Sequence, residues 1–137
     1  MMTPSELMTL AKEARQHAYA PYSGCKVGAA LLCADGTVYG GCNIENAAYG
    51  PTNCAERTAI FKAVYDGHRE FTAIAVCGGM EAESTDTFPP CGVCRQVMRE
   101  FCRDDFVIYL EEGNGSIAVY TLSELLPHSF QKEKHLK

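Results

Sequence analysis

The sequence has few basic residues and no long apolar run. Lysine and arginine together number 12, against 17 aspartates and glutamates, which gives a formal net charge of −5 at pH 7. A nucleic-acid-binding surface needs a stripe of basic side chains, so this balance argues against such a partner and favours a small neutral or cationic substrate. No apolar segment approaches the roughly 18–20 residues of a membrane-spanning helix. Internal repeats and low-complexity segments are also missing, so neither a membrane partner nor a repeat architecture is expected.

Residues 1–16 mix acidic and basic side chains and do not read as a secretory signal. The chain nevertheless has eight cysteines among 137 residues. Without a signal segment, a reducing compartment is the better expectation, and we predict a cytoplasmic protein. Its cysteines should then be metal ligands and buried free thiols rather than disulfides.

Length and composition predict one compact domain that covers residues 1–137. Apolar residues make up 47% of the chain and charged residues 21%, which is ordinary for a globular protein. A capping box predicts the start of the first helix. Thr3 is the expected N-cap, Pro4 the first helical residue, and Glu6 the residue whose side chain bonds back to the N-cap backbone. Small and apolar residues then recur at helical spacing as far as Ala18, and Pro21 ends the pattern.

Short apolar segments alternate with helical ones along the rest of the chain. Strands are expected at 27–32, 38–43, 71–77, 106–110 and 117–120, and helices at 54–66, 91–103 and 123–126. A hairpin turn at 34–37 joins the first two strands. Asn53 is the expected cap of the second helix and Gly67 its stop. The polar loop 78–90 is long enough to be a candidate for function, and the charged tail 131–137 is expected to be frayed.

This order of elements predicts an α/β fold, a three-layer α/β/α sandwich with a five-stranded mixed sheet. The helices expected at 54–66 and 91–103 can lie side by side on the sheet. Their N-termini would then bring Cys54 close to Cys91 and Cys94.

A divided set of three cysteines carries the main chemical signal. Cys91 and Cys94 are spaced C-x-x-C, and Cys54 comes from a distant segment. Three protein ligands leave the fourth tetrahedral position of a zinc ion open, as catalytic zinc requires. Glu56, two residues after Cys54, would be a proton carrier beside that open position.

Three thiolates around Zn²⁺ give a net charge of −1, which weakens the ability of the metal to acidify a bound water. Helix N-termini would offset this charge with their backbone N–H groups. Arg57 would add hydrogen bonds to a thiolate.

Three plainer interpretations compete with a catalytic zinc site. The cysteines can hold a structural zinc, although such sites normally have four protein ligands. Cys91 and Cys94 can form a redox pair, which would leave Cys54 and Glu56 without a role. Glu56 can also be the second half of a capping box with Asn53. The other cysteines (25, 33, 42, 77 and 102) read by default as core thiols.

Several segments resemble the small, homotetrameric, zinc-dependent cytidine deaminases of the cytidine and deoxycytidylate deaminase superfamily. The zinc segments are NCAER at 53–57 and PCGVCRQ at 90–96, which follow the ligand-x-Glu and Pro-Cys-x-x-Cys layout of zinc nucleobase deaminases. The resemblance extends over nearly the whole chain. Its other segments are YAPYS at 19–23, VGAAL at 27–31, GCNIENAAY at 41–49 and ELLP at 124–127.

The resemblance implies roles for further residues. Asn43 and Glu45 would bind the ribose hydroxyls, and a carboxylate there would repel the phosphate of a nucleotide. Ala55 would offer its backbone to the pyrimidine. Phe130 would stack on the base from a neighbouring subunit, and the stretch that ends at Tyr49 would lie at that shared interface. Without the resemblance, Phe130 reads as a tail aromatic that closes the core, and Asn43 and Glu45 as polar residues after a strand.

Cys25 is a departure from the family pattern. The family usually has phenylalanine at this position, where the aromatic ring packs beside the bound nucleoside. A cysteine is smaller and cannot stack in the same way, so Cys25 bears on which nucleoside is preferred.

The sequence therefore predicts a zinc-dependent hydrolase with one Zn²⁺ per chain, which converts cytidine and deoxycytidine to uridine and deoxyuridine with release of ammonia. Its expected place is pyrimidine salvage. The alternatives are a deaminase of the same fold for a modified or antibiotic nucleoside such as blasticidin S, and a non-catalytic zinc-binding module. An editing enzyme on single strands would need the basic and aromatic surface that a chain of net charge −5 is not expected to have.

Overall fold

The computed structural model describes residues 2–80 and 87–136. Five strands form one sheet in the order β2-β1-β3-β4-β5. Their bounds are β1 Lys26–Cys33, β2 Val38–Cys42, β3 Phe71–Gly79, β4 Val107–Glu111 and β5 Ile117–Thr121. β3 and β4 are parallel, whereas the other neighbouring pairs are antiparallel. The predicted five-stranded mixed sheet is therefore confirmed.

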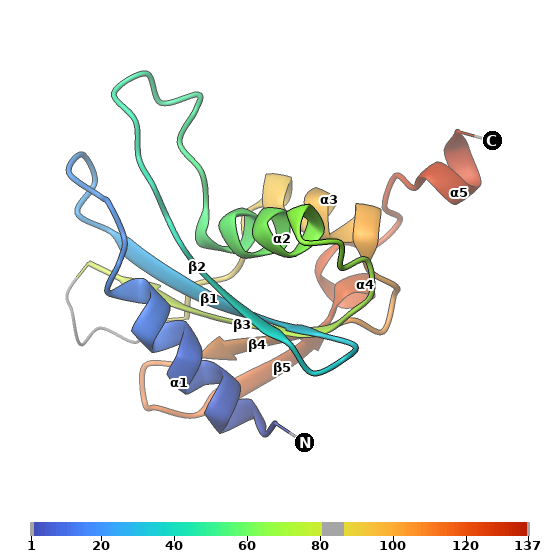
Figure 1. Ribbon diagram of the computed structural model, residues 1–137, viewed down its shortest axis with the longest axis horizontal. Coiled ribbons are helices and arrows are strands. Elements are labelled where there is room, and N and C mark those ends of the chain that lie inside the picture. The colour runs from blue at the N-terminus through green and yellow to red at the C-terminus, as the bar shows by residue number, and fades with distance from the viewer. Residues whose placement is uncertain (1, 81–86, 137) are drawn as a thin grey trace.

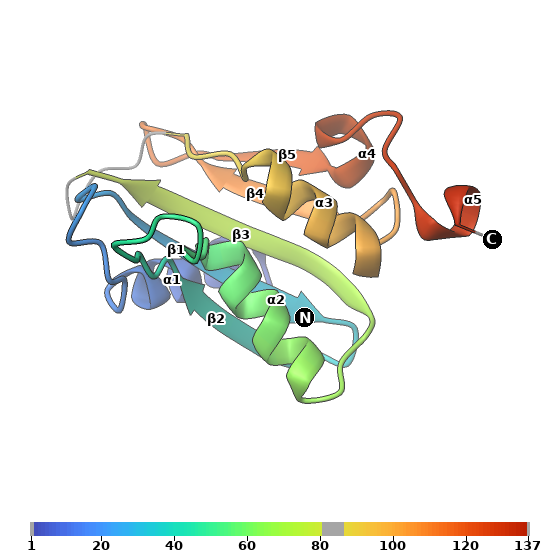
Figure 2. The same ribbon diagram turned by 90° about the horizontal axis from the view of Figure 1, so that it is seen from above.

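Helices cover both faces of this sheet, as the sandwich prediction requires. α1 (Pro4–Arg15) lies on one face, and α2 (Ala55–Tyr65) and α3 (Gly92–Phe101) lie side by side on the other (Figures 1 and 2). The short helices α4 (Leu122–Leu125) and α5 (Lys132–His135) follow β5. Two apolar clusters fill the two spaces between sheet and helices. One contains Leu7 and Met8 of α1, and the other contains Ile60 of α2 and Met98 of α3.

Two strand glycines let the helices approach the sheet closely. A Cβ on Gly28 of β1 would lie 2.1 Å from the carbonyl oxygen of Ala11 in α1. A Cβ on Gly41 of β2 would lie 2.4 Å from the carbonyl oxygen of Ala55 in α2. Both distances are shorter than non-bonded atoms tolerate, so a glycine is needed at each crossing. Gly41 thereby fixes where the first turn of α2 lies, and this turn carries the candidate catalytic residues.

The start of α1 is as the sequence predicts, but its end is not. Thr3 and Glu6 exchange both hydrogen bonds of the capping box. The helix ends at Arg15, however, and the prediction that it continues through Ala18 is wrong. Tyr19 instead forms a bridge with Ile44, which draws the chain out of the helix toward the loop after β2.

Two further expectations need correction. Asn53 does not cap α2, because the N-cap residue is Cys54 and the Asn53 side chain instead donates to the hydroxyl of Thr58. The tail is not wholly frayed, because residues 132–135 form α5 and the ring of Phe130 stacks on His135. The expected loop 78–90 is only partly tested. β3 extends to Gly79, and residues 81–86 lie outside the described part of the chain.

Within residues 2–80 and 87–136, every helix is too short or too polar to cross a membrane.

Candidate metal centre and active site

The three cysteines singled out in the sequence meet at the N-termini of α2 and α3. Cys54 is the N-cap of α2 and Cys91 is the N-cap of α3. Cys94 lies one turn further along α3 and is buried. The three sulfur atoms all lie within 4.8 Å of one another. The predicted convergence of these segments is therefore what the fold produces.

The spacing of the sulfur atoms fits a zinc ion. Zn–S bonds are about 2.3 Å long, so two thiolates on a tetrahedral zinc are about 3.8 Å apart. The Sγ atoms of Cys54 and Cys91 are separated by 3.8 Å. Three such ligands leave one tetrahedral position for a further ligand.

Two of the three sulfurs accept hydrogen bonds from neighbouring donors. The guanidinium of Arg57 donates to Sγ of Cys54 at 3.3 Å, and the backbone N–H of Cys94 donates to Sγ of Cys91 at 3.4 Å. Hydrogen bonds from Cys94 and from Arg57 hold the pKa of the Cys54 thiol well below its usual range. The positive ends of two helices add to this effect. The charge support predicted for Arg57 and for the helix N-termini is thus present in the geometry.

Glu56 lies in the first turn of α2 beside the sulfur cluster, with only 3% of its surface exposed. Burial raises the pKa of its carboxyl group to about 7, and the negative charge of Cys54 adds to the rise. A carboxyl group with a pKa near neutrality can both accept and release a proton. The capping explanation fails, because α2 begins one residue later than Asn53 would require.

A pocket of about 220 Å³ opens beside this cluster. Cys54, Glu56 and Cys91 line one part of it. The predicted substrate residues Cys25, Asn43, Glu45 and Ala55 also line it. A second hollow, of about 330 Å³, adjoins it and shares Ser23, Glu45 and Thr52 with it. Tyr49 lies in that second hollow, with a φ of 52° and most of its side chain exposed.

Asn43 and Glu45 also form hydrogen bonds with the backbone of a segment that forms part of the pocket wall. The Asn43 amide accepts from the backbone N–H of Val27 at 2.8 Å and donates to the carbonyl of Cys25 at 2.8 Å. Glu45 accepts from the backbone N–H groups of Tyr22 and Ser23 and from the Ser23 hydroxyl. Both side chains therefore fix the segment 22–27, which carries Cys25.

Phe130 does not line the pocket of its own chain as far as the described residues show. It is 56% exposed, stacks on His135 with ring centroids 5.0 Å apart, and is anchored by Gln96, which donates to its carbonyl. The alternative that Phe130 closes the core does not agree with this exposure.

Several residues of the pocket wall were not among those expected from the sequence, namely Ser23, Val27, Thr52, Asn53, Phe88 and Pro89. Arg95, which braces the site, was not expected either. Phe88 and Pro89 line the pocket, and the only signal for them was the length of the loop in which they lie. Arg95 donates to the carbonyl of Pro90 at 2.7 Å and to that of Leu125 at 2.7 Å. This brace ties the segment before Cys91 to α4.

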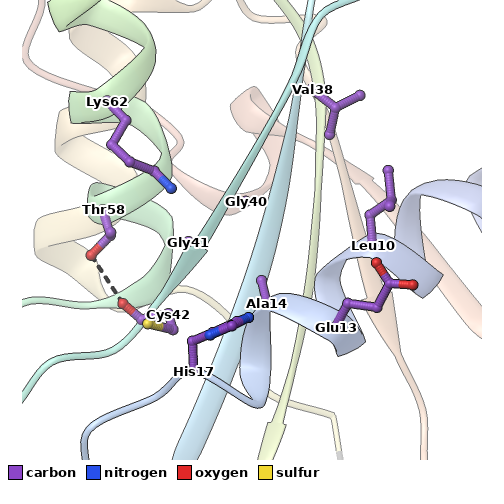
Figure 3. A pocket seen from close by; sticks show the side chains of 10 residues that line it. All are labelled: Leu10, Glu13, Ala14, His17, Val38, Gly40, Gly41, Cys42, Thr58 and Lys62. Carbon is purple, nitrogen blue, oxygen red and sulfur yellow. Dashed lines mark hydrogen bonds between the residues drawn. The ribbon is translucent and has the colours of Figure 1, made fainter.

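Another hollow, of about 360 Å³, lies between α1, β2 and α2 (Figure 3). Glu13 of α1, His17 just after that helix and Lys62 of α2 line it, together with Gly40 and Gly41 of β2. The hydroxyl of Thr58 donates across it to the carbonyl of Cys42 at 3.0 Å. Neither the three clustered sulfurs nor Glu56 line this hollow, so the chemistry belongs to the smaller pocket.

An α/β/α sandwich with three thiols and a buried carboxyl group at two helix N-termini defines the class of zinc-dependent deaminases. A family model, the cytidine and deoxycytidylate deaminase zinc-binding region, matches residues 1–110. A cytidine deaminase from Sporosarcina psychrophila is 52% identical over 132 residues, which cover 96% of this chain and 94% of that relative. The chain therefore belongs to the cytidine and deoxycytidylate deaminase family, and zinc is its cofactor.

Solved structures agree with this placement. The crystal structure of cytidine deaminase from Burkholderia pseudomallei has a TM-score of 0.87 and 50% sequence identity, and the match covers 94% of this chain and 100% of that one. A blasticidin-S deaminase from Bacillus cereus is more distant, with 31% identity over 110 residues and coverage of 77% of each chain.

Proposed function

We propose that this protein catalyses the hydrolytic deamination of cytidine and deoxycytidine to uridine and deoxyuridine with release of ammonia. It is thus a hydrolase acting on the C–N bond of a cyclic amidine. The observation that carries this proposal is the buried carboxyl group of Glu56 in one pocket with the sulfurs of Cys54 and Cys91. Relatives that share about half of their residues with this chain are cytidine deaminases, which supports the choice of substrate.

In the proposed mechanism, Cys54, Cys91 and Cys94 hold the metal and Glu56 moves the protons. When bound, zinc supplies Lewis-acid activation of the attacking water. Glu56 accepts a proton from this water and delivers it to the pyrimidine ring nitrogen beside the amino-bearing carbon. The deprotonated oxygen bonds to that carbon, which becomes tetrahedral. Glu56 then carries the second proton, from the hydroxyl now on this carbon, to the amino group, so the C–N bond breaks, ammonia leaves and the ring carbonyl forms.

Asn43 and Glu45 are the proposed sugar-binding residues. Their hydrogen bonds to the segment 22–27 fix them rigidly, and both line the pocket. Oε1 of Glu45 accepts from two backbone N–H groups and Oε2 from the Ser23 hydroxyl, so Oε2 has a lone pair left to accept from a ribose hydroxyl. A fixed negative charge at this position disfavours a phosphate, so the proposed substrates are free nucleosides. Ala55, which lines the same pocket, would offer its backbone to the base.

A substrate panel tests the proposal. Zinc-loaded protein is assayed for ammonia release with cytidine, deoxycytidine, cytidine monophosphate, adenosine, guanine and blasticidin S. We expect turnover of cytidine and deoxycytidine and little of the others. Preference for blasticidin S would support the antibiotic-nucleoside alternative, and zinc binding without ammonia release from any compound would indicate a non-catalytic zinc module.

The active site is proposed to be shared between the subunits of a homotetramer. Phe130 is exposed and does not line the pocket of its own chain within the described residues, so it is available to a neighbouring pocket. Tyr49 is exposed at the rim, where a neighbour would contact it. A base stacked on an aromatic ring gains about 1–3 kcal/mol, so the loss of Phe130 should weaken binding strongly.

Subunit mixing tests this arrangement. Glu56→Gln chains and Phe130→Ala chains are each expected to show little activity alone. Mixed tetramers contain sites with Glu56 from one chain and Phe130 from another, so activity should reappear on mixing. Sedimentation measures the assembly in parallel. A fully active monomer, or mixing that restores nothing, would contradict shared sites.

Cys25 is proposed to widen the nucleoside pocket. It is half-buried on the pocket wall, where the family usually has phenylalanine. Cys25→Phe adds a stacking ring worth about 0.5–1.5 kcal/mol beyond its buried area. We expect the kcat/KM of this variant for cytidine to rise by roughly 2- to 10-fold, and its kcat/KM for cytidines with bulky substituents to fall.

Cys25→Ala is the matched control, because it removes the thiol without filling the space. It should keep the substrate preferences of the parent chain. An equal loss on all substrates with Cys25→Phe would show that Cys25 is a packed core residue.

A cytoplasmic location and a place in pyrimidine salvage complete the proposal. All eight cysteines are free thiols. Free thiols of this kind persist in a reducing compartment. The proposed products, uridine and deoxyuridine, are nucleosides that salvage reactions consume.

A further inference from the structure

A second cluster of metal-binding side chains lies at the other end of α2 from the zinc centre. It consists of Cys33, Asp35 and His68, and their ligand atoms all lie within 4.8 Å of one another. The hairpin between β1 and β2 and the connection from α2 to β3 lie together at this end of the sheet in both views (Figures 1 and 2). α2 has 11 residues, about 16 Å at 1.5 Å per residue, so the two clusters are well separated.

The backbone brings these three residues together firmly. Cys33 is the last residue of β1, and Asp35 lies in the hairpin turn that Gly36 closes with a φ of 93°. His68 follows Gly67, which ends α2 with a φ of 100°. The backbone N–H of Ala34 donates to the carbonyl of Glu70 at 2.9 Å, which ties the hairpin to the α2–β3 connection.

Neighbouring groups also orient the Asp35 and His68 side chains. Oδ1 of Asp35 accepts from the backbone N–H of Thr37 at 3.0 Å, which turns Oδ2 toward Nδ1 of His68. The His68 ring meets Tyr39 edge to face, with centroids 5.4 Å apart. Tyr39 in turn donates to Asp66 at 2.7 Å. Partners that hold ligand side chains in place in this way accompany metal sites.

The distance between the side chains of Asp35 and His68 is close to the separation of two ligands bound to one metal ion. Oδ2 and Nδ1 are 3.7 Å apart, which is too long for a hydrogen bond. Two N and O ligands about 2.0–2.1 Å from a tetrahedral zinc are separated by about 3.3–3.4 Å, so a small closing movement would suffice. Cys33 supplies a thiol beneath this pair, with only 1% of the residue exposed.

We propose that Cys33, Asp35 and His68 form a second, non-catalytic site for a divalent transition metal such as Zn²⁺ or Co²⁺. A ligand set of sulfur, imidazole nitrogen and carboxylate oxygen suits these cations, whereas Mg²⁺ and Ca²⁺ prefer oxygen ligands alone. A bound ion would clamp the β1–β2 hairpin to the end of α2 and thereby stabilise the fold.

The catalytic centre is the better formed of the two clusters. The Sγ atoms of Cys54 and Cys91 are already 3.8 Å apart, which is the separation of two thiolates on a tetrahedral zinc, whereas Asp35 and His68 must first move a few tenths of an ångström closer together. Protein purified without added metal should therefore hold zinc at the catalytic centre and leave the second site to be titrated.

A cobalt titration of the zinc-loaded protein tests the proposal. Co²⁺ is added, bound cobalt is counted by equilibrium dialysis, and the charge-transfer absorption of a thiolate–cobalt bond is recorded. Zinc is counted at the end to confirm that the catalytic ion stays in place. We expect one cobalt per chain with thiolate absorption, and at least 10-fold weaker binding in both Cys33→Ser and His68→Gln.

The variants keep the test decisive. His68→Gln changes a partly exposed side chain and should fold even if Cys33→Ser does not. Cys77→Ser is the matched control, since Cys77 is an equally buried thiol on β3 that belongs to neither cluster of the described residues. Absence of cobalt binding by the zinc-loaded parent chain, or equal binding by the parent and His68→Gln, would overturn the proposal. Retained deaminase activity in His68→Gln would separate this result from any failure of the proposed function.

Discussion

Replacing Glu56 with glutamine is expected to remove nearly all turnover while zinc and fold remain. The carboxyl group is buried beside the sulfur cluster, and glutamine has almost the same shape but cannot shuttle a proton. Loss of a general acid–base group costs about 10²–10⁴-fold in rate. Because Glu56 is proposed to move more than one proton in each cycle, the loss should lie at the upper end of that range.

Steady-state kinetics with metal analysis measure this effect. Glu6→Gln is the matched control, since Glu6 also lies in the first turn of a helix and there does complete a capping box. Glutamine can perform that capping, so the control should keep full turnover. Residual activity of Glu56→Gln above about a tenth of the parent rate, with zinc retained, would contradict the proton-transfer role.

The sequence predicts the metal centre well because its parts depend on local rules. A C-x-x-C pair at a helix start places both sulfurs near one helix end, as found for Cys91 and Cys94. A glutamate two residues after Cys54 must then lie in the same first turn as that ligand. The meeting of the two helices follows from the order of the elements, since both connect to central strands of one sheet.

The binding pocket is less predictable, because its walls come from contacts that spacing does not encode. Asn43 and Glu45 are expected as sugar ligands, yet in the structure they also fix the backbone of segment 22–27. Phe88 reaches the pocket from a loop whose path no periodic pattern describes. The end of α1 was likewise missed, since the bridge between Tyr19 and Ile44 is a tertiary contact that outweighs helical spacing.

Helix caps show the same limit at the level of one residue. Asn53 is a better N-cap by propensity than Cys54, yet α2 begins after Cys54. The Thr58 hydroxyl accepts a hydrogen bond from the Asn53 side-chain amide, so this side chain has a partner other than the helix N-terminus. As a result, Cys54 is the N-cap residue. Its sulfur makes no capping hydrogen bond and lies beside the other two thiols.

Replacing Cys91 with serine is expected to remove the metal without removing the helix cap. Sγ of Cys91 accepts from the backbone N–H of Cys94 and so caps α3. A serine hydroxyl is an even better N-cap, but it is a poor zinc ligand compared with a thiolate. Cys91→Ser should therefore keep the fold and lose both zinc and turnover, whereas Cys91→Ala also loses the cap, at about 0.5–2 kcal/mol of stability.

The other ligands and their support should form a graded series. Cys54→Ala and Cys94→Ala are each expected to lose metal and activity. Arg57→Ala leaves all three sulfurs in place and removes the guanidinium that donates to Cys54, so its zinc affinity should fall by about 10–100-fold. Cys42→Ala, at a half-buried thiol outside both clusters of the described residues, is the control that should keep about one tightly bound zinc per chain.

Metal counts in this series are cleanest in the His68→Gln background, where the proposed second site cannot contribute. Zinc is measured after dialysis and activity after zinc is added back. If Cys54→Ala, Cys91→Ser or Cys94→Ala kept full zinc and full turnover, the assignment of that cysteine as a ligand would be wrong. An open tetrahedral site needs all three thiolates to hold its ion. If only one of these three variants lost zinc and turnover, the metal would have to be held by a different set of ligands.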